Sequence, residues 1–344
     1  MAEIIGEYVD RLITVEMRPG NLPIRGMIRQ FYDCARKNLG VTSLTLLAAQ
    51  KIIENVGQND NVFIMNGFSS VPHCPHGETD GPLGSASMAR AVSLGLSAKP
   101  LFIVGEREVE PLKSSAKAAG LNIEDYDIVK GSRNAAAVVT FSYGNDNEAR
   151  EAAADLIDRY SPKCIFSFET MGPNRAGVHH SVQGFPYEGP KLYPFFDEAR
   201  KRGILTIAGI DGGNEIGSGN IEEEVRRIVP HGDVCQCPCQ SGLACRVTAD
   251  VTIPTATSNW AAYGISAMLG FLLKKPDLLQ DADTERRMLE ACIMAGGVDG
   301  VTFRPIPAVD GMSGEANRCV ISLLHEIVGN GLIEGAWGRT QDRL

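Results

Sequence analysis

Short apolar, β-rich runs alternate along this chain with segments of helical spacing, and this alternation constrains its fold more than any other feature. Parallel strands need long crossover connections, which helices usually supply. The sequence therefore predicts an α/β fold, a mostly parallel sheet flanked by helices with glycine-rich acidic loops at strand ends. The expected strands are Val62–Met65, Leu101–Val104, Ala137–Phe141, Cys164–Phe168 and Ile204–Ile210, with Thr248–Thr257 resembling a strand that leads into a helix.

Apolar residues spaced three and four apart predict helices between and after these strands. The expected helices are Leu44–Val56, Ala86–Leu96, Asn147–Tyr160, Tyr193–Arg202, Glu222–Val229, Ala262–Leu273, Thr284–Ala295 and Arg318–Val328. We expect residues 1–344 to form a single large α/β unit, because no Pro- or Gly-rich linker divides them. A boundary near residues 230–250, giving subdomains 1–235 and 236–344, is the alternative.

The charge balance and the cysteines limit the partners and the compartment. The 33 basic and 42 acidic residues give a net charge of −9, which argues against a nucleic-acid partner. The N-terminus lacks the pattern of a signal peptide, and the apolar stretch Trp260–Leu273 is shorter than the roughly 20 residues of a membrane span. Nine cysteines without a secretory signal predict reduced thiols and a cytoplasmic protein. We expect a small carboxylate-bearing substrate and no membrane partner, with a homo-oligomer left open.

The loop Gly77–Ser85 contains the first group of candidate site residues, Glu78, Thr79 and Asp80. In open α/β sheets, ligands bind where the carboxyl ends of strands meet the amino ends of helices. The two carboxylates are oxygen ligands suited to a hard cation, and the helix that begins at Ser85 offers N–H groups to a substrate carboxylate. The structural alternative is a helix cap made by Asp80 or Ser85.

The second loop follows the apolar strand Cys164–Phe168 and begins with Glu169. A glutamate at that position is costly unless it is paired or bound to metal. Asn174 and Arg175 follow in the same loop, and the Arg175 guanidinium has the fork geometry that binds a carboxylate. The structural alternative is an ion pair between Glu169 and Arg175.

The third loop, Gly209–Asn220, combines glycines with Asp211, Asn214 and Glu215 after a strongly apolar strand. Its spacing fits neither a dinucleotide fingerprint, nor a phosphate-binding P-loop, nor a calcium loop. The polar side chains are candidate oxygen ligands on a backbone that glycine allows to fold tightly. The alternative is an elaborate turn with a helix N-cap.

The fourth loop, Ser258-Asn259-Trp260, opens an apolar helix. Ser258 and Asn259 are candidate substrate-binding residues, and a helix N-cap is the structural alternative. The pairs Asp299-Gly300 and Asp310-Gly311 are interpreted as turns.

Two clusters suggest metal ligands of another kind. One is His73-Cys74-Pro75-His76, and the other comprises Cys235, Cys237 and Cys239 with Cys245 beyond them. Structural zinc usually shows C-x₂₋₄-C pairs, and alternating cysteines in a strand cannot all face one ion. Zinc or an iron–sulfur cluster therefore competes here with reduced, packed thiols.

Five short motifs, taken in order, resemble those of the D-glutamate cyclase family. They are Glu78–Pro82, Glu169 with Gly172–Asn174, Asp211–Gly217, Ser258–Trp260 and Val298–Val301, within a resemblance that runs from about residue 40 to about residue 330. The resemblance implies an α/β lyase-type enzyme that converts D-glutamate to 5-oxo-D-proline with loss of water, using a divalent cation such as Mn²⁺ or Mg²⁺.

This interpretation assigns a role to each candidate residue. The metal ligands would be Glu78, Asp80, Asp211, Asn214 and Glu215; the catalytic residues Glu169 and Asp211; and the substrate-binding residues Thr79, Ser85, Asn174, Arg175, Ser258 and Asn259. The alternatives are a metal-dependent hydrolase of a lactam or cyclic amide, a non-catalytic protein that binds a small ligand or metal, and a redox or cluster protein built on Cys235–Cys245.

Overall fold

A central sheet of seven parallel strands organises the computed structural model, which describes residues 1–19, 25–142 and 144–333. The strand order is β3-β4-β2-β1-β5-β6-β7. Their bounds are β1 Asn61–Gly67, β2 Lys99–Val104, β3 Asn122–Ile123, β4 Ala135–Thr140, β5 Cys164–Thr170, β6 Leu205–Ile210 and β7 Val251–Pro254, and a small antiparallel pair is formed by β8 Ala308–Val309 and β9 Met312–Ser313. The predicted α/β class is confirmed.

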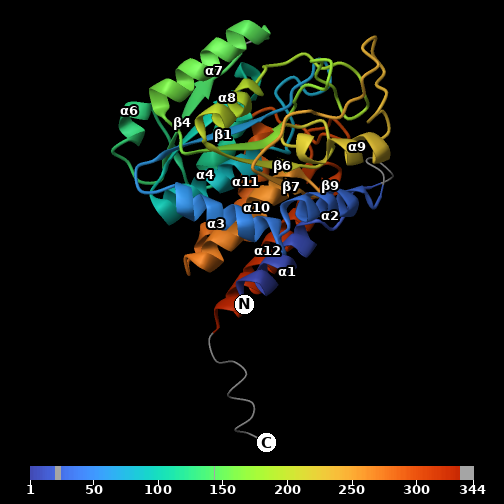
Figure 1. Cartoon of the computed structure of the whole chain (residues 1–344). Coiled ribbons are helices and arrows are strands. Elements are labelled where there is room, and N and C mark those ends of the chain that lie inside the picture. Colours follow the sequence, from blue (N-terminus) through green and yellow to red (C-terminus); the bar gives the residue numbers. More distant parts are fainter. Residues whose placement is uncertain (20–24, 143, 334–344) are drawn as a thin grey trace, which may run out of the picture.

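Helices cover both faces of this sheet (Figure 1). One layer contains α3, α4, α5, α10, α11 and α12 with α1 packed against it, and the opposite layer contains α7 and α8. The bounds are α1 Ala2–Ile13, α2 Met27–Leu39, α3 Leu44–Asn55, α4 Pro82–Leu96, α5 Val109–Ala118, α6 Tyr126–Val129, α7 Asp146–Tyr160, α8 Pro194–Arg202, α9 Glu222–Ile228, α10 Ser258–Leu272, α11 Ala282–Met294 and α12 Gly314–Leu332, with 3₁₀ turns at Glu106–Glu108, Gly219–Ile221 and Pro276–Leu278. Every helix and strand expected from the sequence is present, with bounds shifted by a few residues. The elements that were not anticipated are α1, α2, α5, α6, β3, β8 and β9.

The apolar segment near residue 260 forms α10, which lies at the centre of the larger helical layer. Most of its residues are buried, and it packs against α1, α3, α4 and α12. A helix surrounded by other helices is expected to be apolar on all sides. Among the described residues, no helix is both long and apolar enough to cross a membrane.

The order of the strands reverses at β1. The chain places β2 and then β4 on one side of β1, and it returns to place β5, β6 and β7 on the other side. The register sets Asn66 opposite Phe168, and Phe168 opposite Gly209. The loops that leave β1, β5 and β6 therefore start side by side at the carboxyl edge of the sheet, where a ligand crevice is expected in open α/β folds.

The buried side chain of Asp10 fastens the N-terminal helices to this framework. It accepts hydrogen bonds from the Tyr32 hydroxyl at 2.6 Å, from the Leu44 N–H at 2.7 Å and from the Thr45 hydroxyl. Burial raises the pKa of Asp10, and these hydrogen bonds oppose that rise. The segment that follows α1 brings Arg18 to Asp211, which follows β6 at the carboxyl edge of the sheet.

We predict that Asp10→Ala lowers the free energy of unfolding by at least about 2 kcal/mol, because it leaves several buried donors without an acceptor. Urea denaturation followed by circular dichroism measures this loss. Asp33→Ala is the matched control, since its carboxylate is 44% exposed and makes surface ion pairs with Arg29 and Arg36. We expect the control to change stability by less than about 1 kcal/mol. Equal effects of the two substitutions would contradict the role given to Asp10.

Candidate active site

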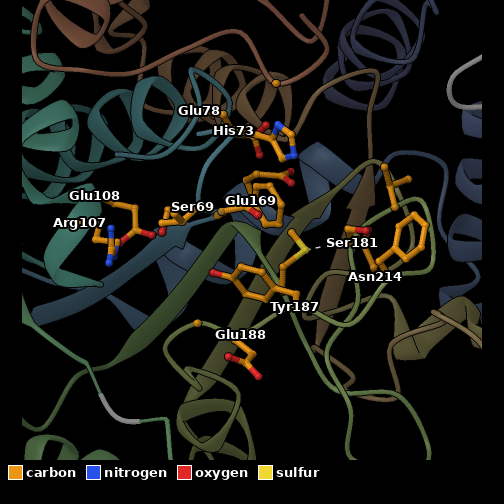
Figure 2. A pocket seen from close by; sticks show the side chains of 18 of the residues that line it. Ser69, His73, Glu78, Arg107, Glu108, Glu169, Ser181, Tyr187, Glu188 and Asn214 are labelled. Atoms are coloured by element: carbon orange, nitrogen blue, oxygen red, sulfur yellow. Dashed lines mark hydrogen bonds between the residues drawn. The ribbon is translucent and has the colours of Figure 1, made fainter. Parts of the chain in front are cut away.

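A cavity of about 1100 Å³ opens at the carboxyl edge of the sheet. It is lined by residues from the loops after β1, β2, β5 and β6 and from the segment 300–310. Figure 2 shows Glu169 near the middle of this cavity, with Glu78 and His73 close by and Asn214 to one side. The cavity therefore coincides with the loops that the sequence singled out.

Three buried carboxylates from three of these loops meet at one point. One oxygen from each of Asp80, Glu169 and Asp211 lies within 4.8 Å of the other two. Glu78 and Glu169 line the cavity together with Asp211. Asp80 and Asp211, which are far apart in the chain, therefore lie close together in the fold.

Two members of the acidic cluster were not anticipated from the sequence. Asp310, interpreted as a turn residue, is buried and lies within hydrogen-bonding reach of Asp211 and Asp80. Arg18 forms ion pairs with Asp211 and, at 3.0 Å, with Asp310. Neither residue belongs to a recognisable motif, and each contributes through contacts that are distant in sequence.

Helices α4 and α10 cap each other and thereby fix the position of Asp80. The Asp80 carboxylate accepts the N–H groups of Ser258 and Asn259, both at 2.8 Å, at the start of α10. In return, the Asn259 side-chain oxygen accepts the N–H groups of Gly81 at 2.9 Å and Gly84 at 2.6 Å, at the start of α4. Each side chain satisfies donors that a helix end would otherwise leave unpaired, and the positive end of α10 faces Asp80.

Glu169 and Asp310 both occupy left-handed backbone conformations, with φ of 50° and 51°. Residues other than glycine adopt this region at a cost, and such strained residues cluster at active sites. The Ser258 hydroxyl donates to Glu169 Oε2 at 2.7 Å, which links the second and fourth loops. The backbone at Glu169 thus turns its side chain into the cluster, where Ser258 orients the carboxylate.

Glu215 organises the third loop from within. Its carboxylate accepts the backbone N–H groups of Asp211 at 2.8 Å, Gly212 at 2.6 Å and Gly213 at 2.6 Å. The side chain is fully buried, and its role matches the structural alternative of an elaborate turn more closely than that of a metal ligand. Asn214 lines the cavity and donates to the carbonyl of His180 at 3.0 Å.

The structure places four of the proposed substrate-binding residues in other roles. The Thr79 hydroxyl donates to the Ala308 carbonyl. The Ser85 hydroxyl is buried in α4, and the N–H groups of Gly81 and Gly84 at the start of that helix donate to Asn259. Asn174 donates to the Gly242 carbonyl, away from the acidic cluster. Arg175 is half-exposed, pairs with Glu222 and Glu223 in place of Glu169, and does not line the cavity.

Burial dominates the electrostatics of the cluster. Burial raises the pKa of Asp80 to about 8, with a further rise from the charge of Asp310, while the Asn259 N–H and Arg18 oppose it. Burial also raises the pKa values of Glu78, Glu169 and Asp211, and the neighbouring carboxylates add to each rise. Among the described residues, Arg18 is the cation paired directly with these acids. Its single charge leaves the cluster with an excess of negative charge when the acids are ionised.

The donor set and one orphaned side chain are consistent with a hard cation at this point. Carboxylate oxygens are the ligands that Mg²⁺ and Mn²⁺ prefer. Asn66, at the end of β1, is fully buried, and neither its Oδ1 nor its Nδ2 has a hydrogen-bond partner among the described residues. A Cβ atom added at Gly81 would lie 3.0 Å from the Glu169 side chain and 3.5 Å from that of Asn66, so these groups surround the same small space.

Comparisons with known proteins identify a family for this chain. The family model described as D-glutamate cyclase-like, C-terminal, matches residues 25–325. The human protein named D-glutamate cyclase, mitochondrial, is 26% identical over 218 residues, which are 62% of this chain but 33% of the human protein. The chain thus matches about a third of the length of that relative.

Among solved structures, the chain matches the crystal structure of ureidoglycine-glyoxylate aminotransferase from Bacillus subtilis, with 10% identity over 96% of this chain and 92% of that one. The TM-score of 0.22 is too low to support a conclusion about fold or function. The family match covers every loop that contributes to the acidic cluster, although Arg18 lies before it. On this match, the chain belongs to the D-glutamate cyclase-like family.

Proposed function

We propose that this chain cyclises an acidic amino acid, D-glutamate or a close analogue, to a five-membered lactam with loss of water. The observation that supports the proposal most directly is the convergence of Asp80, Glu169 and Asp211 at a cavity, in a chain of the D-glutamate cyclase-like family. The family suggests the substrate class, and the meeting of the three carboxylates suggests the residues.

Lactam formation joins the amine of glutamate to the carbon of its own side-chain carboxylate. Because the reaction is intramolecular, holding the substrate in a bent conformation recovers up to ~7–11 kcal/mol of the barrier. Two obstacles remain, since a carboxylate is a poor electrophile and the amine is protonated near neutral pH. The ammonium group loses two protons in all, and the departing carboxylate oxygen gains both and leaves as water.

Asp80 and Asp211 would hold a divalent cation, Mn²⁺ or Mg²⁺, with Glu78 beside them. When bound, the cation supplies a Lewis acid that neutralises the carboxylate under attack. The N–H groups of Ser258 and Asn259 fix Asp80, and the loop held by Glu215 fixes Asp211. Rigid placement of both carboxylates keeps the site ready for a charged substrate.

Glu169 is our candidate for the proton transfers. Burial and the neighbouring carboxylates raise its pKa, so the carboxyl group holds a proton more readily than an ordinary glutamate does. Glu169 would accept protons from the ammonium group and pass them to the departing oxygen. The hydroxyl of Ser258, at 2.7 Å, holds the carboxylate in place during both steps.

Arg18 takes over the substrate-binding role that the sequence assigned to Arg175. It lines the cavity, and its Nε has no hydrogen-bond partner among the described residues. Its contacts with Asp211 and Asp310 hold the guanidinium in place, so that a free N–H group can meet the α-carboxylate. Arg107 also lines the cavity and adds positive charge at its exposed side.

Product analysis tests the proposed reaction. The purified chain is incubated with D-glutamate, L-glutamate or small lactams in the presence of Mn²⁺, and the products are identified by mass spectrometry. We expect a product one water lighter than D-glutamate, and no turnover after exhaustive chelation until a divalent cation is restored. A product one water heavier than a lactam would indicate a hydrolase, and saturable binding without turnover would indicate a binding protein.

We predict that Asp211→Asn lowers kcat at least about 100-fold while the fold is retained, the scale expected for loss of a charge-stabilising group. Steady-state kinetics and circular dichroism measure the two effects. Asp158→Asn is the control, because its carboxylate is 68% exposed and pairs with Arg202 at the surface. Near-normal turnover in folded Asp211→Asn protein would remove Asp211 from the mechanism.

Arg18 and Arg175 provide a second, paired test. We predict that Arg18→Gln lowers kcat/KM at least about 100-fold, because the substrate carboxylate and two buried aspartates lose their cation. Arg175→Gln removes only exposed ion pairs and should change kcat/KM less than about threefold. The reverse ranking would restore Arg175 as the residue that binds substrate.

The stability of the cation-free protein should depend on pH in a defined direction. The folded-state pKa of Asp80 lies above the ordinary 3.8, at about 8. Stabilisation by its bound proton is therefore complete below about pH 4 and is lost as pH rises through about pH 8. We predict a Tm that falls across this interval in chelator, and a larger rise in Tm on adding Mg²⁺ at pH 8 than at pH 5, because cation and proton compete.

Asp310→Asn is the control for this titration, since it removes one charge from the cluster while keeping the size of the side chain. We expect a shallower dependence of Tm on pH in this variant. The same Mg²⁺ effect at both pH values in the wild-type protein would show that the cation does not bind at these carboxylates.

A further inference from the structure

A second group of metal-ligand side chains lies outside the acidic cluster, between two loops. Cys235, Cys237 and Cys239 follow one another in turns after α9, and His180 comes from the loop after β5. One ligand atom from each of these four residues lies within 4.8 Å of the others. His180, Cys235 and Cys237 are buried, and Cys239 is partly buried.

The distances within this group are those of a compact four-membered set. The sulfur atoms of Cys235, Cys237 and Cys239 lie 3.1, 3.3 and 3.5 Å from one another. The Nε2 atom of His180 lies 3.3 Å from the sulfur of Cys237 and 3.9 Å from that of Cys239. A tetrahedral zinc ion, with Zn–S bonds of about 2.3 Å and Zn–N bonds of about 2.0–2.1 Å, places sulfurs about 3.8 Å apart and nitrogen about 3.5 Å from sulfur. These five separations are therefore near those around a zinc ion, with the sulfurs somewhat closer to one another, and all four atoms lie within 4.8 Å of one another.

Hydrogen bonds around the group orient two of its members. The other ring nitrogen of His180, Nδ1, lies 3.1 Å from the carbonyl of Val178. A bond of this kind fixes the tautomer so that Nε2 can bind a metal, which is the usual arrangement of metal-binding histidines. The Asn174 amide donates to the sulfur of Cys239 at 3.4 Å and to the Gly242 carbonyl at 2.6 Å, and so supports a thiolate.

Alternating cysteines are poor zinc ligands in a strand, where their side chains would point to opposite faces. The segment forms turns instead, and all three sulfurs point to one centre. Cys245, which the spacing grouped with them, is absent from the set and accepts the N–H group of Val247.

We propose that Cys235, Cys237, Cys239 and His180 bind one zinc ion. Three cysteines and one histidine form a closed, four-coordinate donor set that is characteristic of structural rather than catalytic zinc. The ion would join the segment after α9 to the loop that contains Ser181 and Val182, which lines the cavity. Its role is to hold that wall of the cavity in place.

The wall is also connected to the acidic loop, which makes the position of the zinc site relevant to the reaction. Asn214 in the third loop donates to the carbonyl of His180 at 3.0 Å. The segment after α9 is joined to the same wall, since the Gln236 N–H donates to the Gly184 carbonyl at 2.8 Å. Loss of the ion would therefore loosen the cavity wall without removing a group that contacts substrate.

The test is performed on the full chain, purified under reducing conditions without a metal-affinity step. Elemental analysis is expected to give about one zinc per chain that persists after dialysis against a chelator strong enough to strip Mg²⁺ or Mn²⁺. X-ray absorption at the zinc edge is expected to show three sulfur neighbours and one nitrogen neighbour. This measurement on wild-type protein does not depend on whether any variant folds.

Variants assign the ligands. Cys237→Ser should lower the zinc content at least about tenfold, whereas Cys239→His should retain zinc with two sulfur neighbours in place of three. Cys245→Ala is the matched control from the same segment, and Asp211→Asn is the control from the acidic cluster. Both controls should keep the full zinc content.

Each other outcome overturns the proposal. Protein that contains no zinc and takes up none from added zinc salt, with all thiols reduced, would establish packed free thiols. A disulfide found by mass spectrometry would establish a redox pair, and iron with visible absorbance would establish an iron–sulfur cluster. Zinc bound by oxygen and lost in Asp211→Asn would place the ion in the acidic cluster. None of these results affects the test of lactam formation.

Discussion

Burying several carboxylates around one arginine is the constraint on which the rest of this structure depends. Asp80, Glu169, Asp211 and Asp310 are all buried, and Arg18 alone among the described residues pairs with two of them. Desolvation makes such a group unfavourable unless protons or cations neutralise it. A fold that maintains this group must fix its carboxylates through strong contacts. Backbone N–H groups hold Asp80, the Ser258 hydroxyl holds Glu169, and Arg18 holds Asp211 and Asp310.

The topology of the sheet and the pairing of two helices supply those contacts. The reversal of strand order at β1 brings the loops after β1, β5 and β6 to the same edge. Helices α4 and α10 then exchange caps through Asp80 and Asn259, so the acid that would hold a cation also closes a helix. In the proposed function, one side chain would serve both stability and cation binding, and its hydrogen bonds to two backbone N–H groups offset the cost of burying it.

The cavity has two walls of different construction. One is formed by the acidic loops, where hydrogen bonds from backbone N–H groups hold charged side chains. The other contains the loop from His180 to Tyr187, which has little regular secondary structure. Contacts with the segment after α9, such as the hydrogen bond from the Gln236 N–H to the Gly184 carbonyl, hold this loop in place. Long loops need such additional connections, because few backbone hydrogen bonds hold them in one conformation. The cluster of Cys235, Cys237 and Cys239 lies where this connection is made.

The sequence by itself determined the α/β class, the main strands and helices, and the loops that carry Asp80, Glu169 and Asp211, because periodicity and strand-end position are local properties. Tertiary structure alone decided which side chains complete the site. Arg18 meets Asp211 across 193 positions, and His180 meets Cys237 across 57, distances at which no local pattern relates two residues. It also decided that Glu215 folds its own loop and that Arg175 faces the surface. The role of a charged residue depends on its partner and its solvent exposure in the packed fold, and the spacing of residues in the sequence predicts neither of them.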